Sequence, residues 1–117
     1  VFHDRIKKWL SANYYLAGVD AKFGNRLPQA YRYFKQAKRY GNEKADKMLK
    51  ELEKAGKRLF QNAYVMHNDR PEKAQQLLKT ALQIIPPDNP YYKKSQKLLR
   101  KITGEGRSGD SAEEDDF

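Results

Sequence analysis

The chain has 117 residues, which is enough for a single domain with a modest hydrophobic core. It contains no cysteine, which excludes disulfide bonds and thiolate metal sites, and it has no apolar run long enough to span a membrane. The formal net charge of +9 is unevenly distributed, because residues 104–117 hold one arginine and six acids. Residues 1–103 therefore hold 23 bases and 9 acids, a charge of +14.

This composition divides the chain into a basic helical domain at 1–103 and an acidic tail at 104–117. The tail is rich in glycine and acids and has no periodicity, so we expect it to be disordered. The chain begins with Val1 instead of methionine, which indicates a piece of a larger protein. No signal-peptide pattern is present, and the lack of cysteine fits a reducing compartment, so we expect a cytoplasmic protein.

The first half of the chain predicts two helices. The first covers residues 4–23. Its expected buried face is Ile6, Trp9, Leu10, Tyr14, Ala17 and Ala21. We expect Trp9 to lie in the core and Gly24 to follow the helix as its C′ residue. A second helix at 28–40 is expected to bury Ala30, Tyr31, Phe34 and Ala37. Gly41 is expected to end it, and Asn42 to cap the next helix.

A long third helix is expected from residue 42 or 43 to about 67, with Gly56 as its one potential breaker. Its apolar stripe is Ala45, Met48, Leu49, Leu52, Ala55, Leu59, Ala63 and Val65 or Met66. Such a helix is on the order of 38 Å long. We expect it either to project beyond its neighbours or to bend near Gly56.

The fourth helix, at 69–85, has the clearest start and stop signals. Asp69 is the expected N-cap, with Pro71 in the first turn and Glu72 completing a capping box. Its apolar positions are Ala74, Leu77, Leu78, Ala81, Leu82 and Ile85. Pro86 ends it, and Asn89 before Pro90 begins a fifth helix at 90–102. The inward residues of the fifth helix are Tyr91, Tyr92, Ser95, Leu98, Leu99 and Ile102.

The order Ala74, Leu78, Ala81, Pro86 resembles the second helix of a tetratricopeptide repeat (TPR). A second copy of the spacing occurs at Ala30, Phe34 and Ala37, with Gly18 where a TPR keeps a small residue. The two copies are 44 residues apart, against about 34 in the standard repeat. The resemblance implies an all-α, antiparallel helix-pair array with about two irregular repeats. The fifth helix fits the terminal capping role that repeat arrays need, and the surplus spacing between the two copies is absorbed by an unusually long middle helix.

The stretch Ala74–Leu99 is also similar to TPR-like segments that follow forkhead-associated modules in some bacterial signalling and motility proteins. No part of that phosphothreonine-reading module is present here. The chain departs from the carboxylate-clamp TPRs that bind chaperone tails. Tyr15 and Val19 stand where the clamp has Lys and Asn, Phe60 replaces its second Asn, and only Lys94 matches a basic position.

No catalytic, metal or cofactor site is expected. His3 and His67 are far apart in the sequence, cysteine is absent, and the carboxylates are scattered along exposed helical faces. We therefore expect a protein that is not an enzyme.

The resemblance implies instead a concave groove lined by the first helix of each pair. The residues carried over to that groove are Tyr15, Val19, Lys22, Leu59, Ala63, Met66, Lys93, Lys97 and Arg100. Such a groove has an apolar centre and a basic end, which suits an acidic or carboxy-terminal peptide or a short amphipathic helix. The leading hypothesis is thus a scaffold segment for protein–protein interaction.

Two alternatives stay open. Tyr33 and Tyr40 interleave with cations on the second helix, a pattern that can bind single-stranded nucleic acid, and the basic body suits an anionic membrane surface as well. The acidic tail either competes with a ligand for the basic end or only keeps the protein soluble. The partner and the oligomeric state do not follow from the sequence.

Overall fold

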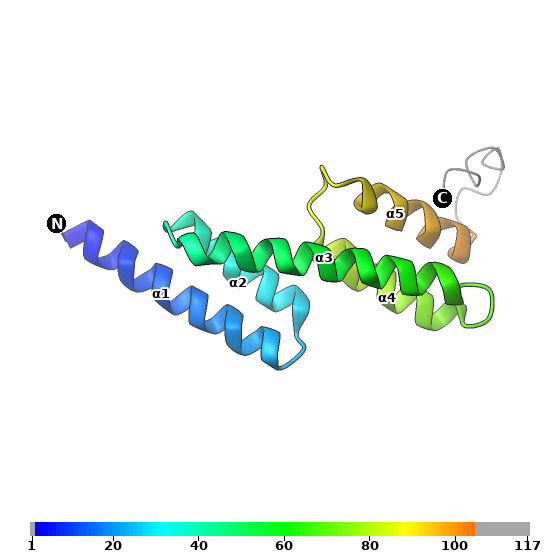
Figure 1. Ribbon diagram of the computed structural model, residues 1–117, viewed down its shortest axis with the longest axis horizontal. Helices are drawn as coiled ribbons and strands as arrows, with labels where there is room; N and C mark the ends of the chain where they lie inside the picture. The colour runs from blue at the N-terminus through cyan, green and yellow to red at the C-terminus, as the bar shows by residue number, and fades with distance from the viewer. Residues whose placement is uncertain (1, 105–117) are drawn as a thin grey trace. The chain divides into compact units, whose positions relative to one another are not determined.

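The computed structural model describes residues 2–104, and this part of the chain is all-α (Figure 1). The helices are α1 (Phe2–Phe23), α2 (Leu27–Arg39), α3 (Glu43–Met66), α4 (Pro71–Ile84) and α5 (Pro90–Thr103). They pack antiparallel in sequential pairs, and α3 is the longest, with 24 residues. The predicted all-α class, antiparallel pairing and long middle helix are therefore confirmed. The predicted disordered tail lies outside the described residues, apart from Gly104.

The chain forms two compact units, which divide between Lys54 and Ala55 within α3. Unit 1 contains α1, α2 and the N-terminal part of α3. Unit 2 contains the C-terminal part of α3 together with α4 and α5.

The core of unit 1 is built on a close approach of α1 to α2. Phe34 of α2 is fully buried, and its ring lies against Gly18 of α1. A Cβ atom at Gly18 would lie 2.5 Å from the nearest ring carbon, so only glycine fits this position without a shift. Ala30 and Ala37 on the same face of α2 have no exposed surface. Three of the four residues predicted to be buried on α2 are therefore buried, and the fourth, Tyr31, is half-buried.

Two left-handed residues end the helices of unit 1. Gly41 has φ +93° and ends α2 as predicted. After α1 the left-handed residue is Asn25, with φ +58°, and not Gly24. The Arg26 amide donates to the Ala21 carbonyl at 2.8 Å and the Asn25 amide to the Lys22 carbonyl at 3.0 Å, which is a Schellman motif with Asn25 as C′. The prediction for Gly24 was wrong by one residue, because asparagine also tolerates this conformation.

Asn42 caps α3 as predicted. Its side-chain oxygen accepts from the Ala45 amide at 3.2 Å. Its amide group donates to the Ser11 carbonyl of α1 at 3.3 Å. The cap therefore also ties the turn between α2 and α3 to α1.

The prediction that Trp9 lies in the core was wrong. Trp9 is 64% exposed and Ile6 is also exposed. α1 is longer than α2, with 22 residues against 13. Tyr40, the residue that follows α2, stacks on Tyr14, and the two ring centroids are 5.9 Å apart. The first two turns of α1 therefore extend past the end of α2 (Figure 1). The buried face of α1 is instead centred on Ser11, Gly18 and Ala21.

Unit 2 packs around small residues in the same way. Its core contains Phe60 and Ala63 of α3, Ala74 and Leu78 of α4, and Leu98 of α5. Gly56 is buried against the side chain of Ile85, at the end of α4, so its role is close packing. α3 continues through Gly56 as one unbroken helix.

Unit 2 also shows how α4 and α5 begin. α4 begins at Pro71 with Arg70 as its N-cap, and no side chain caps it, so the predicted Asp69 cap was wrong. The Asp69 amide instead donates to the Met66 carbonyl at 3.1 Å, in the turn after α3. The predicted Asn89 cap of α5 is confirmed, since its side chain accepts from the Tyr91 amide at 2.8 Å.

Candidate partner-binding surface

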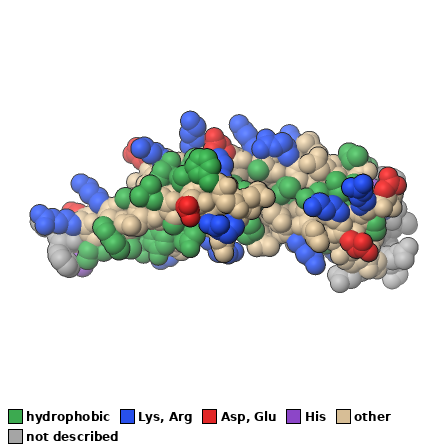
Figure 2. Space-filling view, turned by 90° about the horizontal axis from the view of Figure 1, so that it is seen from below, with side chains coloured by type: hydrophobic (Ala, Val, Ile, Leu, Met, Phe, Trp, Pro, Cys, Tyr) green, Lys and Arg blue, Asp and Glu red, His purple; other side chains and the backbone are tan. Residues whose placement is uncertain are grey.

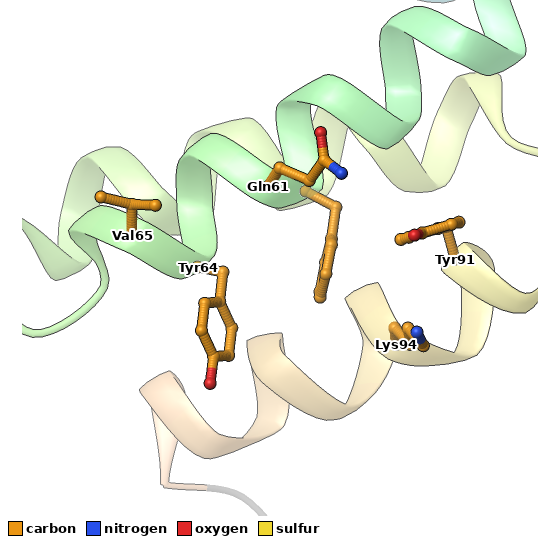
Figure 3. Close-up of a pocket in the computed structure, with 6 residues that line it drawn as sticks. Gln61, Tyr64, Val65, Tyr91 and Lys94 are labelled. Carbon is orange, nitrogen blue, oxygen red and sulfur yellow. The ribbon is translucent and has the colours of Figure 1, made fainter. Parts of the chain in front are cut away.

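Unit 2 carries an aromatic hollow between α3 and α5 (Figure 3). It has a volume of about 330 Å³ and is open to solvent. It is lined by Phe60, Gln61, Tyr64, Val65, Tyr91 and Lys94. Phe60 forms the floor and is almost fully buried, whereas Tyr64 is 44% and Val65 81% exposed at the rim. We refer to these six residues as the aromatic hollow.

The positions of these side chains follow from the spacing of residues along α3 and from the N-cap of α5. Phe60 and Tyr64 are one turn apart on α3, with ring centroids 6.2 Å apart. Tyr91 lies in the first turn of α5, which the Asn89 cap fixes, and its ring meets Phe60 edge-on at 5.6 Å. Because Phe60 packs on the core below and on Tyr91 beside it, the floor of the hollow is preorganised.

Two lysines lie close to the Tyr91 ring. The Lys94 Nζ atom lies 4.8 Å from the ring centroid and the Lys57 Nζ atom lies 5.2 Å from it. Both distances are within the range of a cation–π interaction. Neither lysine forms a salt bridge with a carboxylate of residues 2–104. The rim is thus cationic and open to an external acid.

The sequence around the hollow reinforces this charge. The last helix contains Lys93, Lys94, Lys97, Arg100 and Lys101 and no acidic residue. In unit 1, by contrast, Lys22 forms a salt bridge with Glu51 at 3.0 Å, and Lys38 forms one with Asp46 at 2.9 Å. The hydrogen bonds and charges of these lysines lower the pKa values of Glu51 and Asp46. Basic side chains of unit 1 are therefore partly neutralised internally.

The predicted groove residues fall in both units. In unit 1, Tyr15 and Val19 are half-buried, with the Tyr15 ring 5.7 Å from that of Phe34, while Lys22 is held by Glu51. Tyr15 also lines a shallow hollow with Ser11, Ala12, Leu16 and residues 41–44.

In unit 2, none of the six predicted residues lines the aromatic hollow. Leu59 is half-buried, Ala63 is fully buried in the core, and Met66 packs against that core. Lys93 and Arg100 are exposed, and Lys97 is half-buried. Ala63 therefore contacts neighbouring helices and not solvent.

Sequence reasoning missed the hollow because the repeat template selected the neighbouring positions on α3. The template gave Leu59, Ala63 and Met66, whereas the hollow uses Phe60 and Tyr64. A signal was present, since aromatic residues one turn apart lie outside the small-residue stripe of this helix. Tyr91 was expected to face inward. Its contact with Lys94, three residues further along α5, is local, whereas its contacts with Phe60 and Lys57 of α3 depend on tertiary packing.

Two kinds of site are absent from the described part of the chain. Residues 2–104 contain no group of three or more histidine or acidic side chains that could hold a metal ion. No helix in this range is long and apolar enough to cross a bilayer.

The chain was compared with protein-family models, curated proteins and solved structures. No match was found. Evidence for its function comes from the chemistry of its own surfaces.

Proposed function

We propose that this chain is a non-enzymatic protein-interaction module of TPR-like type, a scaffold segment of a larger signalling protein. Its aromatic hollow binds an acidic partner peptide that inserts one apolar or aromatic side chain. The observation that carries the proposal is an open aromatic hollow whose lysines have no acidic partner among residues 2–104. The TPR-like part is supported by Ala30 and Ala74, which are fully buried against adjacent helices.

The hollow has the makeup of a binding site for one anchor residue. Recognition pockets combine apolar and aromatic walls with a few polar groups that fix orientation. Here the walls are Phe60, Tyr64 and Tyr91, and the polar groups are Gln61 and Lys94. Aromatic anchors in such pockets dominate binding energy at many interfaces.

The charge around the hollow favours an acidic partner. Residues 55–104 hold ten basic and three acidic residues. Cations at the rim of an interface mainly raise the association rate and reject partners of like charge. We therefore assign affinity to the aromatic walls and selection of an acidic peptide to Lys57, Lys94 and the lysines that follow on α5.

The alternative, nucleic-acid binding by Tyr33 of α2 and Tyr40 after it, has less support. Tyr14 stacks on Tyr40 at 5.9 Å with their planes 3° apart, and it also contacts Tyr33. Tyr40 thus already has an aromatic partner on one face of its ring. Nucleic-acid binding through phosphate contacts would fall steeply as the salt concentration rises. The salt dependence of binding therefore distinguishes it from binding through an apolar anchor side chain.

The test is a binding titration with two labelled acidic peptides that differ only at a central phenylalanine or alanine. We expect the phenylalanine peptide to bind more tightly, and Tyr64→Ala to weaken its binding about tenfold. Lys94→Glu should lower the affinity for this peptide about fivefold or more. The matched control is Lys79→Glu, the same charge change on the exposed face of α4. Equal binding of both peptides, or equal loss in Lys79→Glu, would show that only net charge is sensed.

A further inference from the structure

Helix α1 exposes a second apolar surface that the proposed function does not use. Trp9 and Leu16 are each 64% exposed, and Phe23 is 88% exposed. They are seven residues apart, so they lie along one line of the helix. Ala12, which is exposed, and Val19, which is half-buried, lie between them. On the face seen in Figure 2, hydrophobic side chains are likewise at the surface among basic ones.

These five residues have the spacing of a coiled-coil seam. Steps of three and four residues, repeated over positions 9, 12, 16, 19 and 23, are the a and d positions of a heptad. The face of α1 that packs on α2 is a different one, centred on Gly18 and Ala21. Trp9, Ala12, Leu16, Val19 and Phe23 form what we call the α1 seam. A heptad seam is complementary to another helix that carries the same pattern.

From this pattern we infer that the α1 seam is the interface of a homodimer, in which the seams of two copies pack against each other. The first argument is area. Two large aromatic side chains and a leucine, exposed to the fractions given above, offer together with Ala12 and Val19 about 500 Å² per copy. Pairing two copies therefore buries at most about 1,000 Å², which is the size of a weak, reversible interface.

The charges along α1 select the orientation. The N-terminal end carries three bases, Arg5, Lys7 and Lys8, and one acid, Asp4, all exposed, so its net charge is +2. At the other end, Asp20 pairs with Arg26 at 3.3 Å and Lys22 pairs with Glu51 at 3.0 Å. A parallel dimer would bring the two cationic ends together, whereas an antiparallel dimer sets each beside a neutralised end. The antiparallel arrangement is therefore the favoured one.

The test uses sedimentation and the single tryptophan of the full chain. We expect a concentration-dependent monomer–dimer equilibrium, and a blue shift of Trp9 emission as the dimer forms. Leu16→Glu should lower the association constant by about tenfold or more, whereas Gln76→Glu, the same change in charge on exposed α4, should leave it unchanged. A protein that stays monomeric at the highest attainable concentration overturns the proposal. So does a dimer that Leu16→Glu leaves intact.

Two further experiments test the orientation of the two helices and whether the seam binds a second copy of the chain or a membrane. Arg5→Cys introduces the only cysteine at a d position of the same heptad; in a parallel dimer the two copies of residue 5 face each other, whereas in the antiparallel dimer they are roughly 20 Å or more apart. We expect no disulfide-linked dimer under mild oxidation, and efficient linking would refute the antiparallel arrangement. If Trp9 emission shifts only when vesicles with anionic lipid are added, the seam docks on membranes and the homodimer proposal fails.

Discussion

The close approach of α1 to α2 makes a strong prediction for Gly18→Ala. A methyl group at this position would lie 2.5, 2.6 and 2.9 Å from three carbons of the Phe34 ring. Ordinary carbon–carbon contacts are about 3.5–4.0 Å, so the ring has to move by about 1 Å. Phe34 has no exposed surface, which leaves it little space. Overpacking of this kind costs about 1–3 kcal/mol.

Helix propensity opposes this cost, because alanine favours a helix interior over glycine by about 1 kcal/mol. We therefore expect a net loss of up to about 2 kcal/mol in the free energy of unfolding. The assay is urea unfolding of the full chain followed by circular dichroism, with amide exchange to localise the loss to unit 1. In the background Phe34→Leu, which removes the ring, the same change at Gly18 should cost less.

The outcome that refutes this reasoning is a stabilised Gly18→Ala protein. A gain of about 1 kcal/mol would mean that helix propensity acts unopposed and that α1 and α2 are not in close contact. Equal effects of Gly18→Ala with and without the Phe34 ring would refute the assigned contact even if the protein is destabilised.

Three further predictions concern single interactions. Ser95 is fully buried and its Oγ atom has no hydrogen-bond partner among the described residues, so Ser95→Ala should raise the thermal midpoint, with a gain of about 1 kcal/mol. Asn89→Ala removes the cap of α5 and should lower stability by about 1 kcal/mol, measured by urea unfolding, and also weaken acidic-peptide binding because Tyr91 shifts. The lysine partners lower the pKa values of Asp46 and Glu51 below their usual 3.8 and 4.5. Their contribution to stability is therefore present above those values and is lost as the pH falls through the lowered ones. In the double variant with Asn and Gln at these positions, the urea midpoint should change less between neutral pH and about pH 3.

The order and type of the helices follow from the sequence because their signals are local. Proline at the first turns of α4 and α5, asparagine caps and left-handed glycine fix the helix ends within one or two residues. The alanines at 30 and 74 identify the packed faces, because small residues are what close helix contacts require. The cap at Asp69 was predicted wrongly because α4 begins later, at Pro71 with Arg70 as its N-cap, and the Asp69 amide belongs to the turn that follows α3.

The surfaces could not be read from the same signals. Whether Trp9 is buried depends on the length of α2, and the seam on α1 differs from its buried face only by rotation about the helix axis. The aromatic hollow requires Tyr91 and Phe60 to meet, although 31 positions separate them in the chain. Periodicity identifies the faces of a helix, but tertiary contacts decide which face is covered.

The central claim is that the aromatic hollow receives an apolar side chain from an acidic peptide. The most direct measurement is an NMR titration of the full chain with the acidic phenylalanine peptide, observing aromatic and amide signals. We predict the largest shifts at Tyr64, Tyr91 and Lys94, and contacts between the rings of peptide and protein. Shifts confined to the outer lysines of α5, or an identical pattern with the alanine peptide, would contradict the claim.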